Sequence, residues 1–410
     1  MDRGTRSMLV ARRFAPLFAA QFLGALNDNL VKSAFGVLAA WRLAPGSGAE
    51  AGMLAMVAGA VFIAPFLVFS GASGTLADRI DKARVARWTK LAEIPIVAGG
   101  VAGLALESVA LLLASLFLLG LHSTVFGPVK YALLPQHLPP EELVRGNALV
   151  EAGTFLAILL GTVLGSALVL APGGVAAIAG IGFATALGGA LAASRIPPAP
   201  PAAPDAAPRP RILADTIAVL RIAAADRVQL GAILALSWFW AFGAAIVSGL
   251  PVLARDAGGD ETMVTAMLAT FAIGIGAGSL LASRLSRDED PLRLVAPAAV
   301  AMAAFAIDLW LLADGQWRLL ADLLGLSVAG GAFSLPLYAS LQRRGAPGER
   351  ARVIAANNIA NAAAMAGLAV LCAILLGRGW TMPMLVGACG VATLGVAASC
   401  AWLARDARAG

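Results

Sequence analysis

Long uninterrupted apolar stretches recur along the whole chain of 410 residues, separated by short clusters of charged or turn-forming residues. Most are about as long as the roughly 20 residues that a helix needs to cross a bilayer, and none shows the alternation typical of membrane barrel strands. Only 13% of the residues are charged, whereas soluble domains carry about 25%. The sequence therefore predicts an all-α integral membrane protein.

Twelve such stretches are assigned as transmembrane helices. They lie at about 14–40, 52–72, 86–106, 108–130, 147–170, 174–194, 229–253, 262–283, 293–313, 317–341, 352–376 and 381–404. With both termini in the cytoplasm, most of the 30 Lys and Arg residues fall in cytoplasmic loops, including the basic residues of the loop 79–90, as the positive-inside rule requires. Topology thus explains the net charge of +6, and no nucleic-acid partner is expected.

A polar interruption at 195–228 divides the spans into six and six. Its core, PPAPPAAPDAAPRPR (197–211), predicts an extended cytoplasmic linker. We expect an N-terminal half at 1–194 and a C-terminal half at 229–410. A short repeat supports this division, since FGPVKYALLPQHLPPEELVR and FSLPLYASLQRRGAPGERAR share Phe, Tyr, Glu and Arg at a constant offset of 207. Two six-helix halves with inverted repeats resemble the major facilitator fold, where the substrate site lies near the midplane between halves.

The loop after the second span also resembles that superfamily. Its sequence GTLADRIDK is similar to the signature G-x-L-A-D-R-x-G-R/K through Gly74, Asp78, Arg79 and Lys82, with Asp81 where the family prefers glycine. The resemblance implies conformational gating, because an Asp–Arg pair can latch neighbouring helix ends. A plain cluster of surface charge is the alternative interpretation.

Two longer stretches, PLFAAQFLGALNDNLVKSAF (16–35) and FGPVKYALLPQHLPPEELVRGNALVEAGTFLAILLGTVLG (126–165), resemble bacterial lysophospholipid transporters of the LplT type. The resemblance is greatest to the transporter domain that some bacteria fuse to an acyltransferase–acyl-ACP synthetase. It implies flipping of lyso-phosphatidylethanolamine from the outer to the inner leaflet of the bacterial inner membrane, for reacylation by an acyltransferase. One departure is that stand-alone relatives carry a basic residue in the seventh span, and 229–253 has none.

No catalytic site is expected in this chain. Acyltransferases of the fused type use H-x4-D, and neither His122 nor His137 is followed by aspartate at that distance. The cysteines Cys372, Cys389 and Cys400 have no paired spacing or neighbouring histidines. We therefore expect no enzyme activity, disulfide, metal or other cofactor, and a monomer surrounded by membrane lipids.

Polar residues inside the spans are the candidates for substrate binding, because an ionised side chain at mid-bilayer costs about 2.5–3.5 kcal/mol. In the first span, Asp28 precedes Lys32 by one helical turn, the order that favours an intrahelical pair. Asn27 and Asn29 flank this face. A headgroup or gating site is the functional interpretation, and a self-neutralised pair that supports packing is the structural alternative.

Two further polar groups lie on the fourth, fifth and eleventh spans. Their members are Lys130, Tyr131, Asn147, Glu151, Thr154, Asn357, Asn358 and Asn361. The structural alternatives are snorkelling of Lys130 to the interface, stabilisation of Glu151 near a helix start, and interhelical hydrogen bonds from the asparagines. Gly161 and Gly165 are expected to allow close helix packing, and the acid Glu93 has no assigned role.

Two functions remain open. A zwitterionic lysolipid head offers a phosphate for Lys32 or Lys130 and an ammonium for Asp28 or Glu151. The alternative is a proton-coupled major facilitator exporter of amphiphilic drugs, with Asp28 or Glu151 as the protonatable carboxylate. Dependence on an imposed proton gradient distinguishes the two.

Overall fold

The computed structural model describes residues 3–43, 48–201, 211–286, 291–312, 315–346 and 348–409. Within these residues twelve helices are 18 residues or longer, and each matches one predicted span. They are α2 (Ala15–Leu38), α3 (Gly48–Arg79), α4 (Lys82–Ala105), α5 (Val109–His137), α6 (Pro140–Leu168), α7 (Gly174–Ser194), α9 (Arg227–Asp256), α10 (Glu261–Leu285), α11 (Val295–Leu312), α12 (Gln316–Arg344), α13 (Arg350–Gly377) and α14 (Met382–Ala409). Two shorter helices are α1 (Arg3–Val10) and α8 (Ile212–Ala225). Most of the Pro-rich linker core lies outside the described residues.

Ten helices among the described residues are long and apolar enough to cross a membrane. The other two long helices, α2 and α4, are more polar because they carry NDN at 27–29 and KLAE at 90–93. Both helices contact α5 and α7, which are among the ten. We therefore treat α2 and α4 as membrane-spanning, and the chain is a multi-pass membrane protein.

Contacts gather the chain into two compact units. Unit 1 comprises Met1–Pro139, Leu156–Val219 and Ala346–Ile359, and unit 2 comprises Pro140–Phe155, Leu220–Gly345 and Ala360–Gly410. Unit 1 thus includes the start of α13, and unit 2 includes the first half of α6. These two exchanged segments correspond to each other in the repeat: adding the offset of 207 to Pro140–Phe155 gives 347–362, which nearly coincides with Ala346–Ile359.

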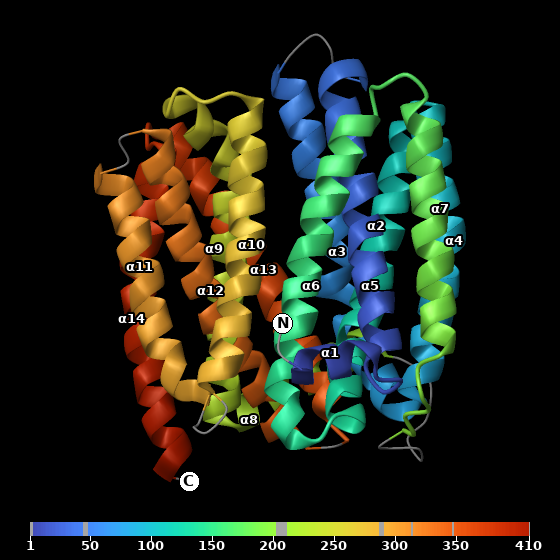
Figure 1. Cartoon of the computed structure of the whole chain (residues 1–410), viewed down its shortest axis with the longest axis vertical. Coiled ribbons are helices and arrows are strands. Elements are labelled where there is room, and N and C mark those ends of the chain that lie inside the picture. The colour runs from blue at the N-terminus through green and yellow to red at the C-terminus, as the bar shows by residue number, and fades with distance from the viewer. Residues whose placement is uncertain are drawn as a thin grey trace. The chain divides into compact units, whose positions relative to one another are not determined.

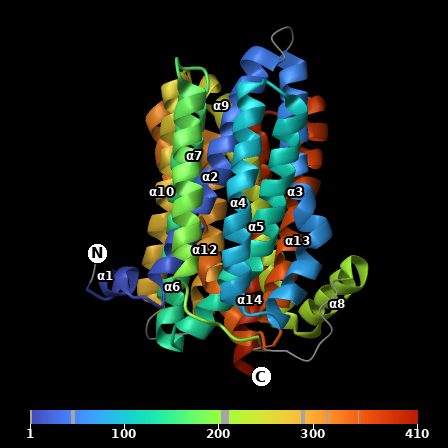
Figure 2. The same cartoon turned by 90° about the vertical axis from the view of Figure 1, so that its right-hand side faces the viewer.

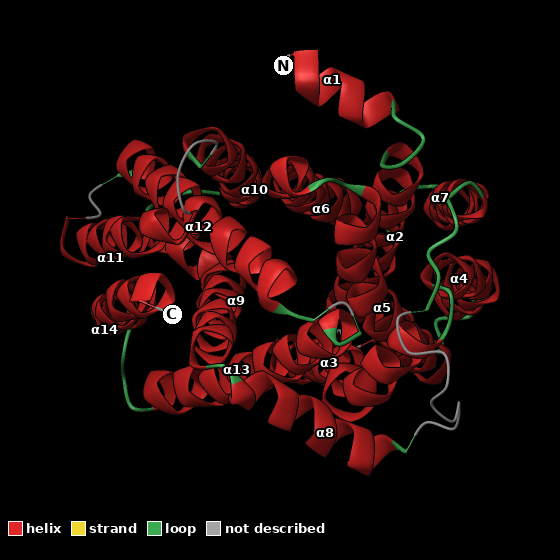
Figure 3. Cartoon of the chain, turned by 90° about the horizontal axis from the view of Figure 1, so that it is seen from below, coloured by secondary structure: helices red, strands yellow, loops and turns green. Residues whose placement is uncertain are grey.

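Within unit 1, the long helices run along a common direction (Figure 1). α4 lies between α5 and α7 and contacts both (Figure 2), whereas the short α1 lies crosswise to the long helices (Figure 3). Within unit 2, α12 contacts α9, α10 and α11, and α14 contacts α9 and α11. Each unit is therefore a bundle of near-parallel helices.

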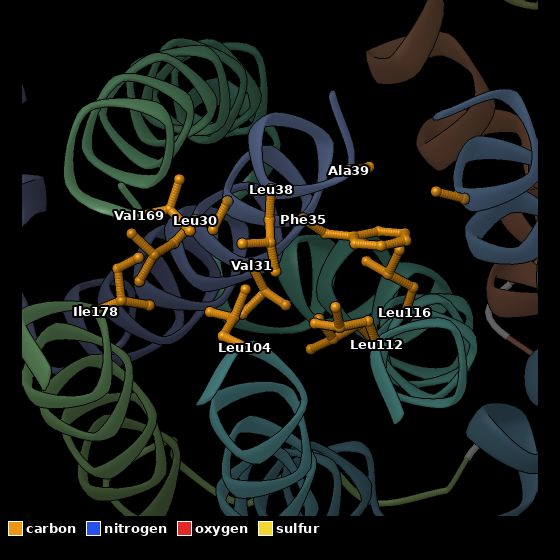
Figure 4. Packing of buried hydrophobic residues seen from close by; sticks show 13 residues of the cluster. Leu30, Val31, Phe35, Leu38, Ala39, Leu104, Leu112, Leu116, Val169 and Ile178 are labelled. Carbon is orange, nitrogen blue, oxygen red and sulfur yellow. The ribbon is translucent and has the colours of Figure 1, made fainter. Parts of the chain in front are cut away.

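An apolar cluster closes the end of unit 1 where α2 and α4 finish and α5 and α7 begin (Figure 4). Phe35 of α2, Leu112 and Leu116 of α5, and Ile178 of α7 have no exposed surface. Because lipid tails are as apolar as these side chains, dispersion from close packing, rather than transfer out of water, holds such helices together.

Small residues bring α6 against α2 beside the NDN segment. A Cβ atom built on Gly161 would clash with the carbonyl oxygen of Leu26, and one on Gly165 would clash with that of Leu30. The expected close packing at Gly161 and Gly165 is therefore present, and its partner is the backbone of α2. This contact fixes the position of α2 along α6, and with it the position of the NDN segment.

We predict that Gly161→Ala lowers the stability of the protein by about 1–3 kcal/mol, since the added methyl group overpacks a backbone contact. The measurement is thermal unfolding in detergent micelles. Gly180→Ala on α7 is the matched control, because a Cβ there meets nothing within 4 Å. Equal melting temperatures for the two variants would contradict the predicted contact.

Candidate functional site

The carboxylate of Glu93 on α4 gathers polar side chains from three helices. Lys90 Nζ donates a hydrogen bond to its Oε2 at 2.9 Å, and Asn27 Nδ2 of α2 donates to its Oε1 at 3.0 Å. His122 of α5 places Nε2 3.4 Å from Oε2, which becomes an ion pair when the imidazole is protonated. Glu93 and Asn27 have no exposed surface, and Lys90 is 1% exposed. We call these four residues the Glu93 network.

Lys90 was counted among the basic residues of the loop 79–90, although the span predicted at 86–106 also contains it, and the structure supports the span. α4 begins at Lys82, so Lys90 lies about two turns inside the helix. Besides its bond to Glu93, Nζ lies 4.7 Å from the centroid of the Phe126 ring. A Cβ on Gly24 would clash with Nζ in its present position, so glycine at this position of α2 leaves room for the ammonium group where it lies.

Asp28 lies beside the Glu93 network and is 7% exposed. The hydroxyl of Ser123 on α5 donates a hydrogen bond to its Oδ2, while Oδ1 has no hydrogen-bond partner among the described residues. Lys32 Nζ lies 5.4 Å from the centroid of Phe62. Within the described residues no ion pair joins Asp28 to Lys32, so the expected intrahelical pair is replaced by separate contacts to α5 and α3. Asn29, also buried, donates to the carbonyl of Ala25 at 2.8 Å.

Glu151 of α6 is the carboxylate at the centre of a polar group in unit 2. It accepts hydrogen bonds from the hydroxyls of Ser279 on α10, at 2.9 Å, and Ser334 on α12. α6 begins at Pro140, seven residues earlier than expected. Glu151 therefore lies about three turns inside the helix, too deep for the helix N-terminus to stabilise its charge, since that effect is confined to the first turn.

Unit 2 also contains hydrogen-bonded pairs of amide, hydroxyl and aromatic side chains. Asn147 and Gln342 exchange two hydrogen bonds, of 2.7 and 2.8 Å. Ser237 of α9 donates to Asn361 Oδ1 at 3.0 Å. Trp240 donates to the Tyr338 hydroxyl at 2.7 Å. Asn361 thus joins an interhelical bond, the structural interpretation offered for it.

The remaining candidates are more scattered. Thr154 donates to the carbonyl of Val150 on its own helix at 2.7 Å. Lys130 Nζ lies 4.9 Å from the centroid of its neighbour Tyr131. Asn357, in unit 1, has no exposed surface, and neither polar atom of its amide has a hydrogen-bond partner among the described residues. The amide of Asn358 lies close to Gly127 of α5.

The loop motif makes a defined contact in unit 1. Asp78, 1% exposed, accepts from Arg352 Nε at 3.3 Å and from the backbone N–H of Ala351 at 3.4 Å. A Cβ on Gly74 would clash with Ala355. Glycine and aspartate of the motif thus hold the first turn of α13 against the end of α3. This is the helix-end contact that the resemblance implied, and its part in gating stays a prediction.

Asp81, the residue that departs from the motif, has two partners. Its side chain caps α4 by accepting from Arg84 N at 3.0 Å, and it accepts from Ala199 N at 3.1 Å. The backbone N–H of Lys82, which is 1% exposed, donates to the carbonyl of Ala199 at 3.1 Å. The aspartate therefore ties the start of the linker to the motif loop, which glycine cannot do.

Several partners of the candidate residues were missed by sequence reasoning. They are Lys90, His122, Ser123, Ser279, Ser334 and Gln342. One signal was available, because Lys90 and Glu93 stand three residues apart and so face the same side of a helix. The serines lie in apolar helices without any distinguishing spacing.

Long helices gathered into two bundles, with carboxylates and amides held inside them, define a polytopic membrane protein of the transporter class. The family model of the Major Facilitator Superfamily matches residues 17–369. The chain belongs to this superfamily.

Curated relatives match most of the chain. It is 30% identical over 352 residues to the lysophospholipid transporter LplT of Serratia proteamaculans (strain 568), covering 83% of this chain and 82% of that protein. It is 29% identical over 349 residues to the lysophospholipid transporter LplT of Yersinia pestis (strain Pestoides F), covering 82% and 80%.

Solved structures support the fold alone. The human organic anion transporter MFSD10 matches with a TM-score of 0.76 at 16% identity, over 96% of this chain and 98% of that one. The transporter FucP in the outward conformation matches with a TM-score of 0.72 at 15% identity, over 95% and 98%.

We predict that Glu93→Gln lowers stability by about 3–5 kcal/mol, because it leaves the Lys90 ammonium buried without its counter-ion. Thermal unfolding in detergent is the measurement. Adding Lys90→Met should restore much of the loss. The control is Glu107→Gln, which breaks the exposed pair with Arg42 (2.8 Å) and should cost less than about 1 kcal/mol. Equal losses at Glu93 and Glu107 would refute the prediction.

Proposed function

We propose that this protein is a lysophospholipid transporter that moves lyso-phosphatidylethanolamine and related lysolipids from the outer to the inner leaflet of the bacterial inner membrane. The observation that carries the proposal is Asp28, a carboxylate that lies inside a spanning helix with one oxygen unbonded among the described residues. Similarity to proteins named lysophospholipid transporter LplT, over most of the chain, supports this substrate class.

The substrate head has two charges, and unit 1 offers a group for each. Asp28 Oδ1 is a hydrogen-bond acceptor for the ethanolammonium, and desolvation strengthens such a charge-assisted bond. Lys32 and Lys130, which contact aromatic rings at 5.4 and 4.9 Å, are cations for the phosphate. A cation–π contact leaves the ammonium hydrogens able to turn toward a stronger anionic partner.

Asn358 of unit 1, and Glu151 and Asn361 of unit 2, are further polar residues that we assign to substrate binding. The Asp78–Arg352 contact, at 3.3 Å, is the element proposed to break and re-form during alternating access. In this proposal the transport unit consists of the halves 1–194 and 229–410 joined by the linker 195–228. Both termini are cytoplasmic, and the protein acts as a monomer, without catalysis, before an acyltransferase that reacylates the delivered lysolipid.

We predict that Asp28→Asn and Lys130→Ala each lower the initial rate of lysolipid flipping at least about tenfold, equivalent to about 1.4 kcal/mol. The assay follows labelled lyso-phosphatidylethanolamine in proteoliposomes. Asp308→Asn is the matched control. Asp308 is partly exposed, and its carboxylate pairs with Arg318 at a distance of 2.8 Å rather than with any candidate residue. Wild-type rates in both site variants would contradict the proposed site.

The same proteoliposomes test the alternative of a proton-coupled drug exporter. Lysolipid equilibration should continue without a proton gradient, because downhill flipping needs no coupled ion. Export of a drug-like amphiphile that follows the imposed gradient, without lysolipid flipping, would replace the proposed function by the alternative.

A further inference from the structure

An apolar groove of about 530 Å³ lies along α4 and α5 of unit 1, on the outer side of the Glu93 network, with which it shares His122. Trp88, Ala92 and Ile96 line it from α4, and Leu118, Leu121 and His122 line it from α5. Cavities that bind small ligands measure about 300–1,000 Å³ and are mostly apolar. The groove therefore has the size and the chemistry of a binding site for a hydrocarbon chain.

The groove opens sideways from the bundle. Trp88 is 54% exposed and Leu118 is 42% exposed, and the exposed apolar surface of a spanning helix faces lipid. Trp is also enriched at the boundary between hydrocarbon and headgroups. The occupant is therefore supplied by the bilayer, in which phospholipid chains are always in large excess.

A cation precedes the lining residues of α4. Arg84 is exposed and lies one turn before Trp88 on the same side of α4. Its backbone N–H donates to Asp81 at 3.0 Å, and its guanidinium has no hydrogen bond or ion pair among the described residues. A guanidinium in the first turn of a helix is opposed by the positive N-terminal end of the macrodipole. A phosphate beside it offsets that repulsion and fits the guanidinium in bidentate fashion.

We propose that this groove binds a resident bilayer phospholipid, with one acyl chain between α4 and α5 and the phosphate on Arg84. The second chain lies in the surrounding bilayer, on the open side of the groove. This lipid is distinct from the transported substrate, so the site does not depend on the proposed function.

His122 connects the groove to the Glu93 network. It lines the groove, is 5% exposed, and neither ring nitrogen has a hydrogen-bond partner among the described residues. Its Nε2 is 3.4 Å from Glu93. A hydrocarbon chain in the groove keeps water away from the imidazole, which preserves the low dielectric around the Lys90–Glu93 bond.

Native mass spectrometry of the purified full chain tests the site. The probe is a phosphatidylglycerol and phosphatidylethanolamine mixture, removed stepwise with detergent. We expect one phospholipid to persist on the wild type. Ala92→Val and Ala92→Phe fill the groove progressively and should lower the retained fraction in that order, by several-fold for Ala92→Phe. Arg84→Gln should lower it several-fold as well.

Two control variants carry the same changes elsewhere in unit 1. Ala177→Phe adds the same bulk on an exposed face of α7, and Arg195→Gln removes an exposed guanidinium beyond the end of α7. Both should retain lipid as the wild type does. Equal retention in Ala92→Phe and Ala177→Phe would overturn the groove assignment, and equal retention in Arg84→Gln and Arg195→Gln would overturn the phosphate assignment.

A competition arm separates the resident lipid from the substrate. If equimolar lyso-phosphatidylethanolamine displaces the retained phospholipid, the groove is a substrate site and the proposal is wrong. Persistence of the diacyl lipid supports it. Flipping by the wild type is measured in parallel. If the protein flips lysolipid but retains no phospholipid, only the resident-lipid proposal is refuted. If it retains phospholipid but does not flip lysolipid, only the proposed transport function is refuted.

Discussion

A charged group inside a bilayer is tolerated only when other protein groups satisfy it, and the carboxylate of Glu93 shows how unit 1 meets that constraint. It bonds to an ammonium on its own helix and an amide on α2, and it lies beside an imidazole on α5. These contacts help to stabilise α2 and α4 as spans, although neither is among the ten long helices with a strongly apolar segment. They also fix the rotation of α2 about its axis through Asn27, and this rotation sets the side of α2 on which Asp28 lies.

Unit 2 satisfies the buried carboxylate of Glu151 differently. Glu151 accepts from two serine hydroxyls, on α10 and α12, and the neighbouring pair of Asn147 and Gln342 is uncharged. A carboxylate bonded to a cation is held more strongly than one bonded to hydroxyls. Glu93 and Glu151 therefore differ in how readily a charged ligand can compete for the carboxylate.

The spans were predictable because each long apolar run must form its hydrogen bonds internally, which in this chain means a helix. The polar face of α2 was predictable for a similar reason, since helical periodicity is local. Its partners were not, because Glu93 lies 66 residues from Asn27 and Ser123 lies 95 residues from Asp28. Lys90 fell in both the predicted loop 79–90 and the predicted span 86–106, because the basic residues that begin at Arg79 continue into the helix and composition alone does not show where the helix starts.

The contact of Asp78 with Arg352 joins residues that are 274 positions apart, yet both belong to unit 1. During synthesis the ribosome delivers α3 long before the first turn of α13. Asp78 therefore has no contact with the guanidinium of Arg352 until nearly all the later helices have entered the membrane. Unit 1 cannot reach its final packing as an independent early product of translation, and its completion depends on one of the last segments of the chain to be made.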